Sequence, residues 1–225
     1  MSARDPLAVP QLSSLLSAAR FATYLTACGG DPAEAIRLYA WNIEASAALW
    51  GGFSLLEVCL RNAMHRELTS LVSHEDWWID PTIRLQREQA DAVAKAVAFV
   101  RSTKGPGYSA DDAVAELTFG FWTALLANRY HQQLWVPALA HSFPQWTGRR
   151  GVLQRRLERL RRLRNRVAHH EPIFARNLVL DHDDILSVLV AIDPAARDWV
   201  AAESRLPAVI AAKADTVAGR RVPQF

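Results

Sequence analysis

Helix start and stop signals recur along the chain and constrain its fold more than any other feature. Asp31-Pro32-Ala33-Glu34 is a start signal, because Asp at the N-cap, Pro at the first helical position and Glu three residues after the cap each satisfy or spare an orphan N–H group. Gly29-Gly30 is a stop signal before it, and Ser109 with Asp112 is a second start. Hairpin dipeptides and alternating strand patterns are absent. The sequence therefore predicts an all-α protein with no significant sheet.

Apolar residues at helical spacing place the predicted helices between these signals. The predicted helical segments are 11–28, 31 to about 71, 82–101, 109 to about 128, 130–142, 148–169, 183–192 and 194–213. Gly51-Gly52 predicts a bend or a break within the second segment. Pro137 predicts a kink or a restart within 130–142.

The length of 225 residues allows a substantial core without disulfides or structural metal. We expect one domain over residues 1–225, with a core at about 30–190. The helix at about 10–28 and the helices at about 183–213 are expected to pack on this core. Hydrophobic residues make up 50% and charged residues 22%, which is typical of a soluble globular chain.

Cellular location is predicted from what the sequence does not contain. No basic segment leads into an apolar one at the start, so we expect no signal peptide. No stretch approaches the roughly 18 uninterrupted apolar residues of a membrane-spanning helix. Cys28 and Cys59 are the only cysteines, and we interpret them as reduced core thiols. These features favour a cytoplasmic protein without a membrane partner.

The segment 149–166 is strongly basic. It contains nine arginines and one acid, Glu158, so it carries a charge of +8 while the rest of the chain carries −5. A narrow apolar stripe runs through it at helical spacing: Leu153, Leu157, Leu160, Leu163 and Val167. The stripe predicts one packed face with arginines around it, and the acids that would pair with them at i,i+4 are missing. We therefore expect a surface that faces a polyanion, although a simply solvated face is the alternative.

This helix is expected to end in a sequence rich in polar and ionisable residues, Arg164-Asn165-Arg166-Val167-Ala168-His169-His170-Glu171-Pro172. Pro172 disfavours helical backbone at Glu171, which places both histidines in the last turn. A helix C-terminus favours the imidazolium and would tend to raise a histidine pKa there. Asn165 and His169 share a helix face, whereas Arg164 lies about 140° from His169. Spacing alone is therefore equally compatible with a structural helix cap.

Several motifs in chain order carry a family resemblance. They are YAWN at 39–42, LLEVCLRNA at 55–63, ELTFGFW at 116–122, LW at 134–135, FP at 143–144 and LRNRVAHHEPIF at 163–174. In this order the sequence resembles the Abi-like proteins of the abortive-infection AbiD/AbiF type, within the HEPN superfamily. The resemblance covers roughly residues 30 to 190, and the RNRVAHHEPIF block is its most specific part.

The resemblance implies a HEPN-type helical bundle with additional helices and, in active members, a metal-independent endoribonuclease. Its signature, R-x4–6-H with a polar residue after the Arg, falls on Arg164, Asn165 and His169. Arginine suits phosphate oxygens and histidine suits proton transfer near neutral pH. HEPN relatives commonly pair two motifs, and one chain offers one motif, so a homodimer is expected. His170 then has a supporting role in packing or hydrogen bonding.

Other residues are expected to support the site or bind RNA. Glu57, Arg61 and Asn62 are expected to support it from a facing helix. The alternative is a surface ion pair on the face that Glu57, Arg61 and His65 share at i,i+4 spacing. The arginines expected to contact RNA phosphates are Arg149, Arg150, Arg155, Arg156, Arg159, Arg162 and Arg166. Tryptophans could stack bases, but most are expected in the core. No cofactor and no metal site are expected, and the acids at 181–184 are interpreted as a helix N-terminus.

Three functions stay open. The leading one is an endoribonuclease effector of antiphage defence or of a toxin–antitoxin pair, which cleaves RNA by attack of its own 2′-OH. The first alternative is a non-catalytic RNA-binding HEPN protein in a ribonucleoprotein or toxin–antitoxin complex. The second alternative is a helical protein-interaction module. RNA and a second copy of the chain are the expected partners, and an antitoxin protein or a small non-coding RNA is a further candidate.

Overall fold

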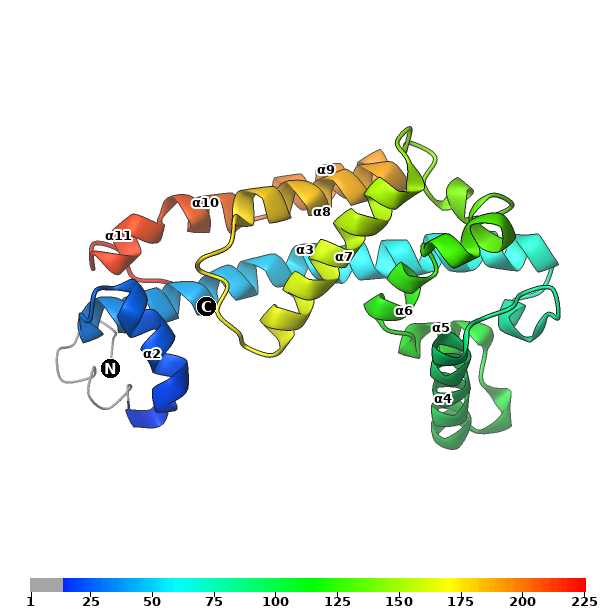
Figure 1. The fold of residues 1–225 in the computed structure, drawn as a ribbon, viewed down its shortest axis with the longest axis horizontal. Helices are drawn as coiled ribbons and strands as arrows, with labels where there is room; N and C mark the ends of the chain where they lie inside the picture. Colours follow the sequence, from blue (N-terminus) through cyan, green and yellow to red (C-terminus); the bar gives the residue numbers. More distant parts are fainter. Residues whose placement is uncertain (1–13) are drawn as a thin grey trace. The chain divides into compact units, whose positions relative to one another are not determined.

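The computed structural model describes residues 14–225 and confirms the all-α prediction (Figure 1). Most of these residues are helical and none lies in a strand. The α-helices are α2 (Ala18–Ala27), α3 (Pro32–Val72), α4 (Arg87–Lys104), α5 (Ala110–Glu116), α6 (Phe119–Ala124), α7 (Arg150–Ala168), α8 (Leu178–Ile192), α9 (Pro194–Glu203), α10 (Leu206–Ala211) and α11 (Lys213–Val217). Short 3-10 turns and one π-helical turn, His131–Trp135, link α6 to α7. The predicted helical residues before position 14 lie outside the described part.

Helix α3 runs through the glycine pair without interruption, so the predicted break at Gly51-Gly52 is wrong. Leu49 and Phe53, on either side of the pair, are buried. Their packing outweighs the roughly 1 kcal/mol that each glycine costs in a helix. By length and composition alone α3 could also cross a membrane, a criterion that the core helix of a soluble protein meets as well.

Four other predicted helical segments differ from the structure. The segment predicted at 109–128 is two helices, because the Thr118 hydroxyl accepts from Phe121 N and starts α6. The segment predicted at 194–213 is three short helices, α9 to α11. Helix α8 begins at Leu178, five residues before its predicted start, and α4 begins at Arg87 instead of Thr82.

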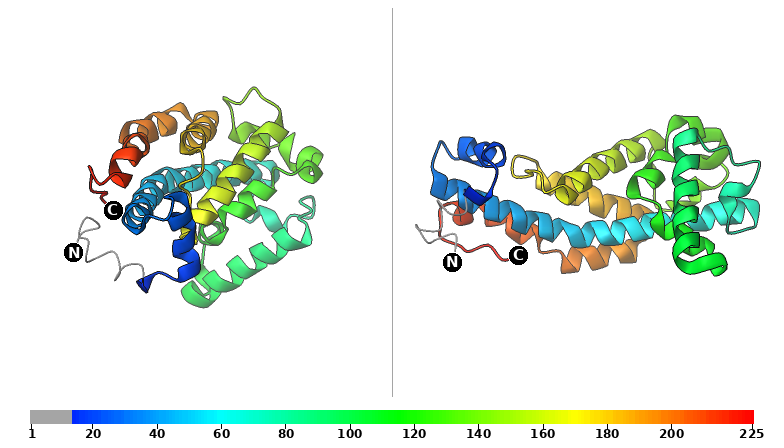
Figure 2. Two further views of the ribbon diagram at one scale, coloured as in Figure 1. Left: turned by 60° about the vertical axis from the view of Figure 1, so that its left-hand side comes forward. Right: turned by 90° about the horizontal axis from the view of Figure 1, so that it is seen from below.

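The chain divides into two compact units whose boundaries fall inside α3, α7, α8 and α9. The first unit comprises residues 14–53, Leu163–Asp183 and Ala202–Phe225. Within it, α10 and α11 lie beside the N-terminal half of α3 (Figures 1 and 2), where Trp41 Nε1 donates to Val209 O. At the chain's end, Arg221 makes a bidentate ion pair with buried Glu44 of α3, with N–O distances of 2.6 Å.

The second unit comprises Ser54–Arg162 and Asp184–Ala201. An aromatic cluster, Trp77, Trp78, Phe121 and Trp122, forms part of its core. The N-terminus of α5 has the predicted capping box between Ser109 and Asp112. Tyr130, also buried, donates its hydroxyl to Gln89 of α4. The prediction of one domain over the whole chain stays a prediction.

Candidate active site at the end of helix α7

Helix α7 packs through the predicted apolar stripe. All five stripe residues are buried: Leu153, Leu157, Leu160, Leu163 and Val167. Spacings of three and four residues keep them on one side of the helix, so the arginines between them are held at the sides or in solvent. The periodicity of the sequence thus correctly predicted which side of α7 faces the protein.

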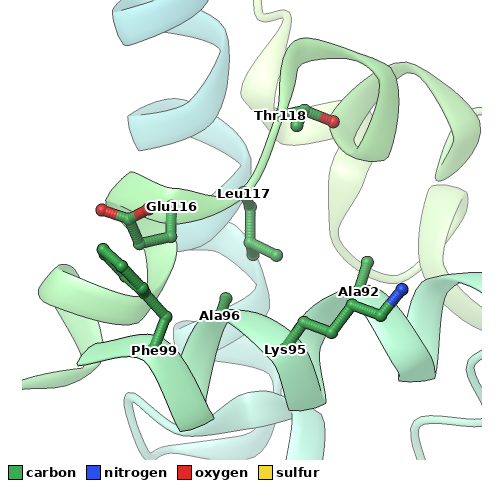
Figure 3. A pocket seen from close by; sticks show the side chains of 7 residues that line it. All are labelled: Ala92, Lys95, Ala96, Phe99, Glu116, Leu117 and Thr118. Carbon is green, nitrogen blue, oxygen red and sulfur yellow. The ribbon is translucent and has the colours of Figure 1, made fainter. Parts of the chain in front are cut away.

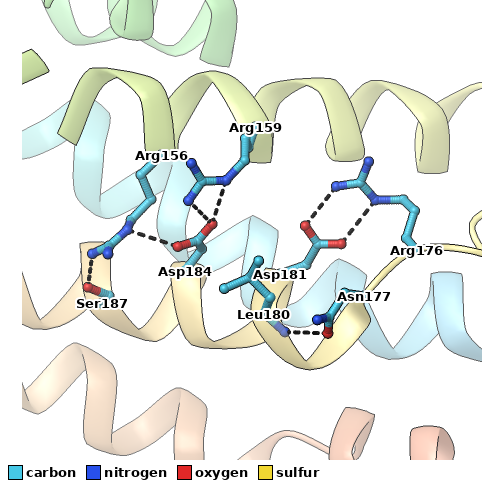
Figure 4. A network of polar contacts seen from close by, with 8 residues as sticks. All are labelled: Arg156, Arg159, Arg176, Asn177, Leu180, Asp181, Asp184 and Ser187. Carbon is cyan, nitrogen blue, oxygen red and sulfur yellow. Dashed lines mark hydrogen bonds and ion pairs between the residues drawn. The ribbon is translucent and has the colours of Figure 1, made fainter. Parts of the chain in front are cut away.

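Three of the predicted RNA-binding arginines are held by the protein itself. Arg156 Nε lies 2.8 Å from Asp184 Oδ1, and Arg159 reaches Asp184 Oδ2 through two nitrogens at 2.6 and 3.0 Å (Figure 4). Arg156 also donates to Ser187, and Arg150 donates to the carbonyl of Leu126 and to the Asn128 side chain. The acid that compensates Arg156 and Arg159 is Asp184 of α8, and it does not come from the i,i+4 positions of α7. A phosphate would have to compete with these existing partners.

Three other arginines of the basic segment, Arg149, Arg155 and Arg162, are exposed. Arg155, Arg162 and His169 follow one another at intervals of seven residues, close to two helical turns. They therefore lie along one side of α7 and of the turn that ends it. Arg155 and Arg162 are thus exposed arginines on the same side of α7 as His169.

The C-terminus of α7 is closed by a Schellman motif. Glu171 N donates to Arg166 O at 2.8 Å and His170 N donates to Val167 O at 3.1 Å. His169 is thus the C-cap, and His170 takes the left-handed position with φ of +56°. Glycine usually occupies this position, since a side chain there costs about 1 kcal/mol or more. The helix ends one residue sooner than predicted, so both histidines belong to the cap instead of to the last turn.

The signature residues differ in how firmly they are held. The Arg164 guanidinium carbon lies 5.3 Å from the ring centroid of Trp50 on α3, in a cation–π contact. Trp50 itself is 42% exposed. Asn165 is half-buried, and His169 is exposed. The arginine is therefore held against an aromatic ring that still reaches solvent, and His169, five residues further along the chain, is exposed.

Arg166 points back to the segment that follows the cap. Its Nη2 donates to Pro172 O at 2.7 Å and its Nη1 lies 3.6 Å from Glu171 Oε2. This arginine was predicted to bind RNA, and the structure gives it a role in closing the end of the helix. Cations at this end also suit the negative pole of the helix dipole. Charge alone therefore does not distinguish a helix cap from a reactive site.

Side chains from three other helices reach the same segment, and the sequence prediction did not include two of them at all. Arg20 of α2 donates to His170 O at 2.5 Å, and Lys213 of α11 donates to Phe174 O at 2.7 Å. Asn42 of α3 accepts from Ile173 N and Phe174 N at 2.7 and 3.1 Å. Asn42 lay within the YAWN motif, but its contacts were not foreseen. Trp50 was missed as well, because nothing in the local sequence marks it as exposed.

The predicted supporting residues Glu57, Arg61 and Asn62 belong to the second unit, on the C-terminal half of α3. Arg61 Nε donates to its neighbour Asn62 Oδ1 at 3.2 Å. His65, on the same face, accepts from Trp77 Nε1 through Nδ1 at 3.1 Å. Burial lowers the pKa of His65, despite nearby carboxylates that act in the opposite direction. The supporting role of the first three residues stays a prediction.

The run at 181–184 was interpreted as a helix N-terminus, but α8 begins earlier, at Leu178, and only Asp181 lies in its first turn. Asp181 lies in the first turn of α8 and, within the first unit, receives Arg176 through two hydrogen bonds of 2.7 and 3.0 Å (Figure 4). Among the described residues no three His, Cys, Asp or Glu side chains come together in a way that could hold a metal ion.

A cavity of about 310 Å³ lies in the second unit, between α4 and the link from α5 to α6 (Figure 3). Its polar lining comes from Lys95, Glu116 and Thr118, and Phe99 forms an apolar wall. Two of these residues come from the ELTFGFW motif. None of the predicted catalytic or RNA-binding residues lines this cavity.

Comparison with known proteins gives no identification. No family model matches the chain, and neither the curated proteins nor the solved structures contain a match.

Proposed function

We propose that this protein is a metal-independent endoribonuclease of the HEPN type. The observation that carries the proposal is the pairing of Arg164, held over the exposed Trp50 ring, with the exposed His169 at the capped end of the same helix. A guanidinium held against an aromatic ring and an exposed imidazole at the end of the same helix are groups suited to a phosphodiester. The resemblance of the RNRVAHHEPIF block to Abi-like proteins supports the same conclusion.

The chemistry needs no group beyond the chain. The RNA 2′-OH attacks the adjacent phosphorus as a base removes its proton, and the 5′ oxygen leaves as an acid protonates it. The arginine donors stabilise the negative charge that develops on the phosphoryl oxygens. The products are a 2′,3′-cyclic phosphate and a 5′-hydroxyl. Histidine can act as base or acid near neutral pH, and Asn165 can orient the substrate.

One motif supplies one well-exposed signature histidine, whereas the reaction uses a base and an acid. A homodimer that brings two copies of His169 to one phosphate satisfies this requirement. In this proposal the exposed line of Arg155 and Arg162 guides the RNA towards the site. The biological role is that of an abortive-infection or toxin effector in the bacterial cytoplasm. An antitoxin protein or a small non-coding RNA is the partner that restrains it.

The direct test compares wild type with Arg164→Ala and His169→Ala on labelled RNA. Both variants should lose cleavage by about 100-fold or more, because general acid–base and electrostatic terms each contribute on that scale. His141→Ala is the matched control, since His141 is also exposed but lies in the second unit. Circular dichroism checks that each variant folds. Full activity of His169→Ala, or wild-type activity that is lost in EDTA, would show that the mechanism is wrong.

The dimer is tested separately. Wild-type and His169→Ala subunits are mixed, exchanged and assayed against each pure protein. Shared sites predict heterodimers with strongly reduced activity. Undiminished cleavage by a monomer, established by sedimentation at the assay concentration, would rule out the shared site.

A second function is favoured by one specific observation. Exposed Arg149, Arg155 and Arg162 can bind RNA phosphates whether or not any bond is cleaved. A non-catalytic RNA-binding protein would bind RNA with the same salt dependence in wild type and in His169→Ala, and neither would cleave. The cleavage assay above decides between these two functions.

A further inference from the structure

We propose that Asn42 is a positioning residue for the Arg164/His169 site, an inference that rests on the proposed function. Asn42 does not touch the reacting groups. It holds the backbone of the segment that follows the Schellman motif, and through this segment it fixes the end of α7 that carries the histidines.

Asn42 fixes the backbone of this segment through two hydrogen bonds. Its side chain is buried, and its single amide oxygen accepts from two consecutive backbone N–H groups, Ile173 N at 2.7 Å and Phe174 N at 3.1 Å. The Ile173 side chain is fully buried as well. Water therefore has little access to the Ile173 amide. Without Asn42 these donors would be left unpaired in a site where that is costly.

Other side chains hold the carbonyl groups of the same segment. Arg20 donates to His170 O, Arg166 to Pro172 O and Lys213 to Phe174 O. The backbone between the histidines and Phe174 is thus fixed by side chains from α2, α3, α7 and α11. This explains how His170 keeps its left-handed backbone, since such a conformation persists where the surroundings over-determine it.

Asn42 differs from the other three because it cannot be replaced by solvent. Arg20, Arg166 and Lys213 are only half-buried, and a carbonyl that loses one of them can accept from water. The Ile173 N–H group has no such substitute, because its hydrogen bond to Asn42 is buried, whereas the bond from Phe174 N is partly buried. Release of Asn42 should therefore open the segment 171–174 locally, and loosen the turn that orients His169.

The experiment compares Asn42→Leu, which has similar volume but no acceptor, with Asn42→Asp, which keeps the acceptor oxygen. Thr123→Val is the matched control, because Thr123 is also buried and hydrogen-bonded but lies in the second unit. We expect kcat of Asn42→Leu to fall about 100-fold, as for a small misplacement of a reacting group, with little change in KM. Asn42→Asp should recover most of this loss, and Thr123→Val should leave kcat unchanged.

Hydrogen exchange gives a second readout that does not require cleavage. The Ile173 and Phe174 amides should be protected in wild type and should exchange at least about tenfold faster in Asn42→Leu. Should Asn42→Leu fail to fold, Asn42→Ala removes the same acceptor without adding bulk, and kcat should fall in it as well.

The outcomes separate this proposal from the proposed function. A wild-type protein that cleaves no RNA overturns the endoribonuclease, whatever the amides do. A wild-type protein that cleaves RNA, together with an Asn42→Leu variant of equal kcat, overturns only the role of Asn42. An unprotected Ile173 amide in wild type, or an unchanged kcat in Asn42→Ala, also overturns that role.

Discussion

The arginines of this protein form two groups that differ in what their charges meet. In the first group an arginine holds a buried carboxylate: Arg156 and Arg159 hold Asp184, Arg176 holds Asp181 and Arg221 holds Glu44. In the second group, Arg149, Arg155 and Arg162 are exposed. Helix α7 carries members of both groups: Arg156 and Arg159 of the first, and Arg155 and Arg162 of the second. The number of arginines on a helix is therefore a poor measure of the charge available to a partner.

The two groups should also respond oppositely to substitution. The three carboxylates are only 1–3% exposed, so each depends on its arginine to offset the loss of water. The exposed arginines contribute little to stability but shape the electric field around the helix. The substitutions that follow test whether the two groups of arginines differ in their effects on stability and on RNA binding.

The largest effect on stability is expected at Asp184. Asp184→Ala leaves two guanidinium groups unpaired, which should lower the free energy of unfolding by about 3–5 kcal/mol. RNA affinity should be unchanged or slightly higher. Asp183→Ala is the control, because Asp183 is adjacent to Asp184 on α8 but is exposed. Chemical denaturation measures the difference, and a loss below about 1 kcal/mol would mean that the pairing contributes little.

Glu44 gives a smaller effect that depends on pH. Burial alone would raise the pKa of its carboxyl, but hydrogen bonds from Arg221 and from Gln224 N outweigh burial and hold the pKa below its usual value. A pKa depressed by folding stabilises the protein above the unfolded pKa of about 4.3 and loses this contribution as the pH falls through the folded pKa. Glu44→Gln should therefore be less stable by about 1–3 kcal/mol at neutral pH. Its stability curve should also be flatter on the acid side, and an unchanged acid slope would contradict the assignment.

The exposed group is tested by replacing Arg149, Arg155 and Arg162 together with glutamine. RNA binding should weaken across sequences, and the slope of log K against log salt should flatten by about 2, at about 0.7 for each phosphate contact. Stability should stay within about 0.5 kcal/mol of wild type. A control triple removes three exposed cations of the α4 region: Arg84, Lys95 and Arg101. Equal losses of RNA affinity in both triples would show that net charge alone matters.

The smallest effect is expected where backbone strain, not charge, is removed. His170→Gly should raise the free energy of unfolding by about 1 kcal/mol, because glycine adopts the left-handed C′ position without strain. Among the described residues, Ser73, with φ of +62°, is the other non-glycine residue with a left-handed backbone conformation. Ser73→Gly is therefore the matched control. A similar gain in both variants, with lower RNA cleavage only in His170→Gly, would give His170 a functional role beyond the cap.

Local features of the fold could be predicted from the sequence, and features set by distant partners could not. The N-caps at Asp31 and Ser109 were predicted correctly, because each involves residues at most three positions apart. The apolar stripe of α7 holds because spacing determines which residues share a face. The break at Gly51-Gly52 was wrong because packing on both sides of the glycines decides whether a helix continues.

The candidate site shows the same limit. Arg164, Asn165 and His169 could be selected from one short motif. Spacing could not show that Trp50 lies against Arg164, or that Asn42 and Arg20 hold the turn after His169, since these contacts join residues more than a hundred positions apart. Nor could it show which arginines of α7 meet Asp184. Those contacts depend on which faces of the helices meet in the folded chain.

The composition of the first unit sets an order of events during protein synthesis. Its three segments come from early, middle and late parts of the described chain. The Glu44 carboxylate can form its ion pair only after Arg221 has been synthesised. A ribosome that has completed α3 and α7 has therefore not yet produced the residues that close the unit around them. Lys213, which holds Phe174, also arrives late. Under the proposed function, the segment after His169 would be fixed only once the residues around Lys213 and Arg221 have been synthesised.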